Sequence, residues 1–390
     1  MGVSFQDILN SLPDLENAIR SMSETIIANL VMISEIPAPT FHEHDRMEFM
    51  VNRFTESGLQ NCSTDEVGNA LGILPGTSGE KNILMVAHLD TLFDDSVDHT
   101  ITVQSDRVIG PGVGDDGMGL AAIASIPSIL EKLDIQLKSN LILMGSARSL
   151  GKGDIGGLRF FLSHTDIPIG TGICVEGVEL GRLSYSSIGM MRCEITCVIP
   201  EEYDWTRFGA SGAVTTMNKV INRILELPIP KQPQTGILLG SVEGGTSFNT
   251  IATQAILKFE IRSESEDMVR QLAYTIESIT EEISSLTNAE VKFHIIAARK
   301  PGGIRFTHPL VERTREVLKV LGIKHRIQPS TSELAAFIAN GIPALTLGIT
   351  TGENMDKLNE SVQIDPMYRG ITQLLGVIHA IDRGYRDESE

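Results

Sequence analysis

The sequence predicts an α/β protein with a mostly parallel sheet flanked by helices and with an inserted α+β domain. Apolar, strand-like runs alternate with helical patterns through the first half of the chain, and these strands read as buried on both faces. From about residue 190 the pattern changes to alternating strands and amphipathic helices, and after about residue 303 the α/β pattern resumes. A chain of 390 residues is long enough for two such domains.

The first half is predicted to form a β-α-β-α-β series. The expected elements are strand 83–90, helix 119–133, strand 140–147, helix 156–164 and strand 170–178. Strands that are apolar on both faces belong to a parallel sheet wrapped by helices. In such sheets the catalytic groups lie at the carboxyl ends of the strands.

The second part of the chain is predicted to be an independent two-layer domain. Its elements follow the order β-α-β-β-α-β, which is the split motif of ferredoxin-like domains. The expected segments are strand 190–199, helix 211–227, strands 235–245 and 252–263, helix 265–286 and strand 289–298. We therefore expect an inserted domain at 190–303, and a discontinuous α/β domain made of 1–189 and 304–390. The last part contains helix 308–322, the mixed segment 332–349 and helix 369–381.

Composition excludes several classes of function. The chain has 32 Lys and Arg against 50 Asp and Glu, a net charge of −18, which argues against nucleic acid or an anionic membrane as a partner. No apolar run reaches the ~18 residues of a membrane span, and the N-terminal residues lack the pattern of a signal peptide. Four cysteines without CxxC spacing do not form a disulfide framework. We expect a cytoplasmic protein.

A histidine and an aspartate lie at the end of the first predicted strand, where apolar residues would pack better. Side chains at positions i and i+2 of a strand point to the same side, so His88 and Asp90 are expected to face one way. A single histidine in an apolar strand is often a satisfied core residue. It can also be a metal ligand with a carboxylate behind it, because donors from His, Asp and Glu suit Zn²⁺, with Mn²⁺ or Co²⁺ as competitors.

The stretch GVGDDG, residues 112–117, has the G-x-G-x-x-G form of a dinucleotide-binding turn. A pyrophosphate there would need bare backbone N–H groups, and the carboxylates of Asp115 and Asp116 would repel it. Two aspartates at the start of a helix either bind a cation or complement the helix dipole, and taken alone they favour neither. A Rossmann-type oxidoreductase is therefore disfavoured.

Several motifs in this order resemble the M20 family of zinc-dependent peptidases and amidohydrolases, the carboxypeptidase, aminoacylase and tripeptidase group. The resemblance covers most of the chain. Its segments are 35–58, HLD at 88–90, GVGDDGMG at 112–119, CVEG at 174–177, GGTSFNTIATQAILKFEIRS at 244–263 and GIPALTLGI at 341–349.

The resemblance implies a two-zinc site bridged by a carboxylate. On that pattern His88 binds one metal, Asp115 bridges both, and Glu176 completes the ligand set of the first metal. Asp90 orients the ring of His88, which is the role of a carboxylate beside a metal-bound imidazole.

The chain departs from the family where the family carries adjacent glutamates, a general base and a ligand of the second metal. The corresponding positions are Ser149 and Leu150; a serine hydroxyl is a very poor base and leucine offers no donor. Asp356 stands where the family has a last histidine ligand. The second metal then keeps at most Asp115 and Asp356, so we expect one Zn²⁺, with the second site weak or lost.

The inserted domain departs as well. The family's lid supplies a histidine to the substrate, but the only histidine between residues 190 and 300 is His294, in the final strand. Arg262 closes the strand 252–263 and can bind a substrate carboxylate or form a structural salt bridge. The family also leads us to expect a homodimer formed through this domain.

Two functions remain open. The first is an M20-like metallohydrolase that cleaves a peptide or amide bond in a small peptide or N-acyl amino acid, slowed by ~10² to 10⁴ because the general base is missing. The second is a catalytically inactive relative that keeps the fold for binding or regulation, since fold depends on the apolar strands and function on a few site residues.

Overall fold

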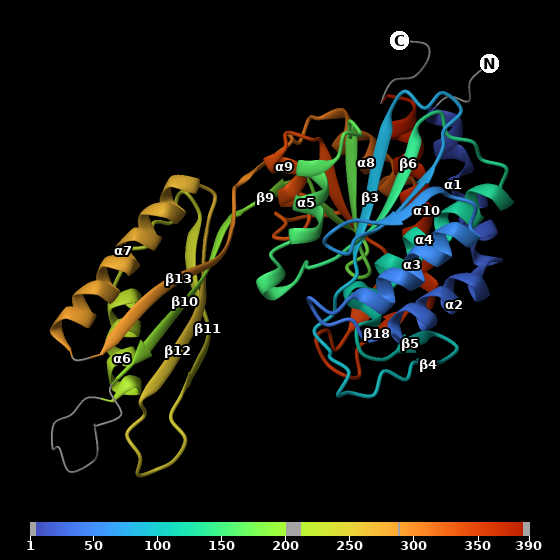
Figure 1. Cartoon of the computed structure of the whole chain (residues 1–390). Coiled ribbons are helices and arrows are strands. Elements are labelled where there is room, and N and C mark those ends of the chain that lie inside the picture. The colour runs from blue at the N-terminus through green and yellow to red at the C-terminus, as the bar shows by residue number, and fades with distance from the viewer. Residues whose placement is uncertain (1–4, 200–211, 288, 385–390) are drawn as a thin grey trace. The chain divides into compact units, whose positions relative to one another are not determined.

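The structure is a computed structural model that describes residues 5–199, 212–287 and 289–384. The chain forms two compact units (Figure 1). Unit 1 consists of Met1–Ser187 and Gly303–Glu390, and unit 2 of Ile188–Gly302. Unit 2 therefore lies inside the sequence of unit 1, where the change of pattern places an inserted domain at 190–303.

Unit 1 is built on an eight-stranded sheet. Its centre is parallel, because β6, β3, β7 and β16 run in one direction, while β1, β2 and β8 join in antiparallel pairs. The strands in spatial order are β1 (Gln60–Thr64), β2 (Ala70–Leu74), β6 (Asn140–Ser146), β3 (Asn82–His88), β7 (Thr171–Glu176), β16 (Ala344–Gly348), β8 (Arg182–Ser184) and β15 (Arg326–Ile327).

Helices cover both faces of this sheet (Figure 1). Along β3, residues 83, 85 and 87 pack into the larger core and residues 84 and 86 into the smaller one. The larger core is covered by α1 (Phe5–Arg20), α2 (Ser23–Ser34), α3 (His44–Glu56), α4 (Met118–Lys132), α8 (Pro309–Val320) and α10 (Ile364–Asp382). The smaller is covered by α5 (Gly156–His164) and α9 (Leu334–Ala339). Because side chains alternate along a strand, His88 lies on the α5–α9 face.

Short elements complete unit 1. A small antiparallel sheet contains β17 (Gly352–Glu353), β18 (Ser361–Gln363), β5 (Arg107–Ile109) and β4 (Thr102–Val103). The turn η1 (Val113–Gly117) precedes α4, and the turn η2 (Gly151–Gly153) follows β6. The strand β9 (Ser186–Ser187) pairs with β14 (Gly302–Gly303).

Unit 2 has the β-α-β-β-α-β order expected from the sequence. Its antiparallel sheet has the order β11-β12-β10-β13, and α6 and α7 cover one face of it. The elements are β10 (Gly189–Val198), α6 (Ala213–Leu225), β11 (Thr235–Gly244), β12 (Gln254–Ser263), α7 (Glu266–Leu286) and β13 (Glu290–Arg299). On β10 the alternate residues Met191, Cys193, Ile195 and Cys197 are buried under the helices.

The predicted fold class is confirmed, with a mostly parallel central sheet and separate antiparallel sheets. Among the element boundaries that differ from the expectation, one bears on the site: β3 ends at His88, so Asp90 lies in the following loop and not on the strand. Within the described residues, no helix combines the length and the apolar character that crossing a membrane requires.

Candidate functional site

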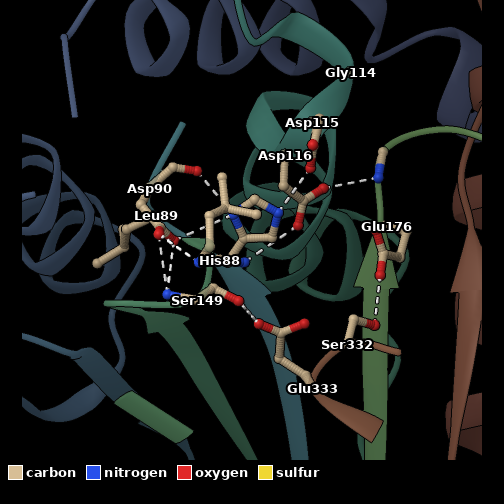
Figure 2. Close-up of polar contacts among 12 residues, drawn as sticks. His88, Leu89, Asp90, Gly114, Asp115, Asp116, Ser149, Glu176, Ser332 and Glu333 are labelled. Atoms are coloured by element: carbon tan, nitrogen blue, oxygen red, sulfur yellow. Dashed lines mark hydrogen bonds and ion pairs between the residues drawn. The ribbon is translucent and has the colours of Figure 1, made fainter. Parts of the chain in front are cut away.

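The candidate site lies at the carboxyl end of the parallel sheet (Figure 2). β3 ends at His88 and its neighbour β7 ends at Glu176, and the two strands are parallel. Parallel strands bring the polar residues at their carboxyl ends to the same edge of a sheet. The turn η1, which carries Asp115, packs against β7 and against α4 at this edge.

His88 is held at both ring nitrogens. Its Nε2 lies 2.8 Å from Oδ1 of Asp115, and its Nδ1 lies 2.8 Å from the backbone carbonyl oxygen of Asp90. The side chain is 4% exposed. Burial lowers the pKa of His88, but the hydrogen bonds to Asp115 and Asp90 outweigh it and raise the pKa well above the usual value.

Asp90 fastens two loops to the end of β3. Its buried carboxylate accepts hydrogen bonds from Thr40 Oγ1 at 2.7 Å, from the backbone N–H of Ser149 at 3.0 Å and from that of Leu150 at 2.8 Å. Its Oδ1 is 3.4 Å from Nδ1 of His88. The Asp90 carboxylate therefore lies beside the His88 ring, as expected, but from the loop after β3 and not from the strand itself. The backbone carbonyl of Asp90 is the nearer acceptor.

Asp115 is positioned through its backbone. Glu360, which is fully buried, accepts hydrogen bonds from the N–H groups of Gly114 at 2.5 Å and of Asp115 at 3.0 Å. Burial raises the pKa of Glu360 to about 7. Burial also opposes ionisation of Asp115, but the hydrogen bond to His88 lowers its pKa.

Asp116, the second aspartate of the turn, links three elements. It is fully buried and accepts hydrogen bonds from the backbone N–H of His88 at 3.2 Å and of Gly177 at 2.8 Å. It therefore joins η1 to the ends of β3 and β7. Burial raises the pKa of Asp116 well above the usual value.

Glu176 contacts Ser332 and Arg182. Its Oε1 accepts a hydrogen bond from Ser332 Oγ at 2.9 Å and lies 3.8 Å from the guanidinium of Arg182. Burial raises the pKa of Glu176, and the positive charge of Arg182 opposes this rise. Arg182 is thus a cation beside the predicted metal ligands.

The loop after β6 carries a serine–glutamate contact. The Ser149 hydroxyl is buried and donates a hydrogen bond to Oε1 of Glu333, which is itself buried (Figure 2). Leu150 takes part through its backbone N–H, which donates a hydrogen bond to the Asp90 carboxylate. The positions expected for the glutamate pair therefore contain no carboxylate of their own, but a carboxylate from another segment reaches one of them.

The remaining predicted residues lie outside this cluster. Asp356 is exposed, in a loop where its φ is 64°. In unit 2, Arg262 forms an ion pair with Glu260 at 2.6 Å, and the Nε2 of His294 lies 3.4 Å from Thr196 Oγ1. The structure contains the salt bridge, and substrate binding by Arg262 stays a prediction.

The predicted ligands are residue types that bind divalent cations, but the structure does not bring all of them together. Among the described residues, no three His, Cys, Asp or Glu side chains are arranged as a metal-binding group. Glu176 accepts a hydrogen bond from Ser332. An imidazole nitrogen with two carboxylates still matches the donors that Zn²⁺ takes, because a carboxylate that accepts a hydrogen bond at one oxygen can bind through the other. At the positions where the family has the glutamate and histidine ligands of a second ion, this chain has Leu150 and the exposed Asp356.

Sequence reasoning did not identify several residues of the cluster. Glu333 precedes the apolar helix α9, where an acidic residue is typical of a helix start and indicates no site by itself. Ser332 and Arg182 also come from segments without a motif. Arg46 did leave a signal: it occupies the same stripe of α3 as Met50 and Phe54, at a spacing of four, and all three are buried.

Comparison with known protein families identifies the family to which the chain belongs. The model of Peptidase family M20/M25/M40 matches residues 84–380, so the chain belongs to this family. No curated protein matches the chain significantly. Family membership supports a peptide or amide hydrolase.

Solved structures share the fold at low sequence identity. A tripeptidase from Staphylococcus aureus is 18% identical, with 93% of this chain and 99% of that chain covered and a TM-score of 0.74. The dipeptidase Dug1p from Saccharomyces cerevisiae is 12% identical, with 96% and 99% covered and a TM-score of 0.79. A Bacillus subtilis protein described as a dinuclear metal-binding M20 peptidase is 13% identical, with 93% and 99% covered and a TM-score of 0.66.

Proposed function

We propose that the protein is a hydrolase of peptide or amide bonds in small substrates, with one divalent metal ion held by His88, Asp115 and Glu176. The observation that carries this proposal is the contact of 2.8 Å between His88 Nε2 and Asp115 Oδ1, with the other ring nitrogen fixed by Asp90. Fixing one nitrogen leaves the other oriented as a ligand, which is how metal-binding histidines are usually held. We propose Zn²⁺, with Mn²⁺ or Co²⁺ as competitors.

The residues around the ion have separate tasks. A divalent ion here supplies Lewis acidity and lowers the pKa of a bound water. Asp90 and Glu360 hold His88 and Asp115 in place through the contacts described above. The loop after β6 offers no carboxylate at Ser149 or Leu150, so the proton acceptor must come from another segment. Small peptides and N-acyl amino acids are the proposed substrates.

A catalytically inactive binding protein is the second candidate. It is favoured by the absence of both expected glutamates, because the Ser149 hydroxyl is a very poor general base and the Leu150 side chain has no atom that can bind a metal ion. It is also favoured by the cationic side chain of Arg182, 3.8 Å from Glu176, where a metal ion would meet a like charge.

Metal content and turnover separate the two candidates. We expect the purified wild type to contain about one metal ion per chain and to hydrolyse members of a panel of dipeptides and N-acyl amino acids, and we expect His88→Ala to lose both because it removes the only nitrogen ligand. The matched control is His379→Ala, which removes a histidine from α10. A wild type without turnover would support the binding protein, and a wild type without metal would contradict the metallohydrolase.

Assembly is a separate expectation. We propose that unit 2 pairs two copies of the chain, as the family resemblance suggests. Light scattering coupled to size-exclusion chromatography would give the mass of the particle, and a mass of one chain at all concentrations would contradict a dimer.

A further inference from the structure

We propose that Glu333 is the general base of this site, a role that replaces the glutamate missing from the loop after β6. The inference rests on the proposed hydrolytic function. It goes further by assigning the proton acceptor to the segment that precedes α9.

The first argument is position. Oε1 of Glu333 accepts the hydrogen bond of the Ser149 hydroxyl, so its carboxylate reaches the place where the family's base is expected (Figure 2). Ser149 is anchored in turn, because its backbone N–H donates to Asp90 at 3.0 Å and Asp90 contacts His88. A short chain of contacts therefore joins Glu333 to the predicted metal ligand.

The second argument is the neighbouring residue. Ser332 donates its hydroxyl to Oε1 of Glu176 at 2.9 Å, so residues 332 and 333 contact both sides of the site. The segment that carries Glu333 therefore also holds the predicted ligand Glu176.

The third argument is the environment of the Glu333 side chain. It is 3% exposed, and a buried carboxylate needs hydrogen bonds, one of which comes from Ser149. It occupies the N-cap position of α9, yet its side chain makes no capping hydrogen bond. No described cation lies within ion-pair distance of it. A residue that only started the helix would face the free N–H groups of α9, whereas this one faces Ser149.

The step balances as follows. As the oxygen of a water molecule bonds to the carbonyl carbon of the substrate, an O–H bond of that water breaks and the proton passes to the Glu333 carboxylate. The C–N bond then breaks, and the same proton passes from Glu333 to the leaving nitrogen. The products are a carboxylic acid and an amine, and Glu333 is ionised again.

Two substitutions at residue 333 test the role. Glu333→Gln keeps the shape and the contact with Ser149 but removes the proton acceptor, so we expect kcat to fall by ~10² to 10⁴ with KM changed only a few-fold. Glu333→Asp keeps a carboxylate, and we expect its kcat to stay above that of Glu333→Gln. Metal content should equal that of the wild type in both. Glu16→Gln, in α1, is the control.

The outcomes separate this inference from the proposed function. If the wild type turns over, loses activity in His88→Ala and keeps wild-type kcat in Glu333→Gln, the base is elsewhere and the hydrolase stands. If Glu333→Gln loses its metal together with its activity, the residue is structural and the inference is overturned. If the wild type binds metal but hydrolyses nothing in the panel, the proposed function fails and this role fails with it.

Discussion

Replacing Arg46 by alanine is expected to destabilise unit 1 by about 3–5 kcal/mol, the usual cost of removing one partner from a buried charged group. Arg46 is fully buried in α3. Its Nη1 donates to the carbonyl of Leu89 at 2.9 Å, and its Nε and Nη2 donate to the carbonyl of Ile36 at 3.1 and 2.5 Å. Burial lowers its pKa to about 10, while the charges of Asp90 and Asp116 act in the other direction.

The cost has two sources. Alanine would leave the carbonyls of Leu89 and Ile36 without their donors inside the protein. It would also remove the positive charge that offsets Asp90 and Asp116, which are both fully buried. Since Leu89 lies between His88 and Asp90, the lost hydrogen bond would destabilise the end of β3 that carries the site.

The measurement is urea unfolding followed by circular dichroism, with separate transitions fitted because two units need not unfold together. Arg53→Ala is the control: it lies in the same helix, its side chain is 25% exposed and it pairs with Glu56 three residues on. We expect it to cost less than about 1 kcal/mol. A value for Arg46→Ala equal to that of Arg53→Ala would contradict the role given to Arg46.

The second large effect is expected from Asp90→Asn, which should weaken metal binding by ~10- to 100-fold. The Asp90 carboxylate accepts hydrogen bonds from Thr40 and from two backbone N–H groups. An asparagine side chain has one acceptor oxygen and a donor NH₂ group, which would face one of those donors. The loop that supplies the carbonyl to Nδ1 of His88 would shift, and Nε2 would lose its orientation.

Zinc titration with a competing chelator measures this affinity directly. Asp382→Asn is the matched control, because Asp382 is also buried and accepts hydrogen bonds from two backbone N–H groups, those of Lys138 and Ser139. It should leave zinc affinity unchanged. Equal affinities for the wild type and Asp90→Asn would show that the backbone carbonyl alone orients His88.

The central fold was predictable because its signal is local. The core strands β3, β6 and β7 are continuous apolar runs, and unit 2 shows clear periods of two and of 3.6 residues. The helices α1–α3 and the small sheet were not predicted. In that sheet β4, β5, β17 and β18 are two or three residues long, too short to show any period.

The site was predictable only where residues follow strands. His88 and Asp115 are 27 positions apart and come into contact, since η1 packs at the carboxyl edge of the sheet. Glu333 and Ser149 are 184 positions apart. Their contact depends on β16, which lies beside β7 and places the segment before α9 at the same edge. No local pattern reports such a placement.

The family resemblance supplied residue roles that geometry alone does not. The structure brings His88 and Asp115 together but leaves Glu176 on Ser332. It also places Asp116 and Glu333 inside the cluster, which the resemblance did not assign. Motifs did not predict these buried polar residues, because their partners come from segments far away in the sequence.

Anomalous diffraction from crystals grown with zinc tests the one-metal site most directly. We predict a single peak per chain at the end of β3, bound by Nε2 of His88 and by carboxylate oxygens of Asp115 and Glu176 at about 2.0–2.2 Å. A second strong peak near Ser149, or no peak beside His88 in crystals of zinc-loaded protein, would contradict it.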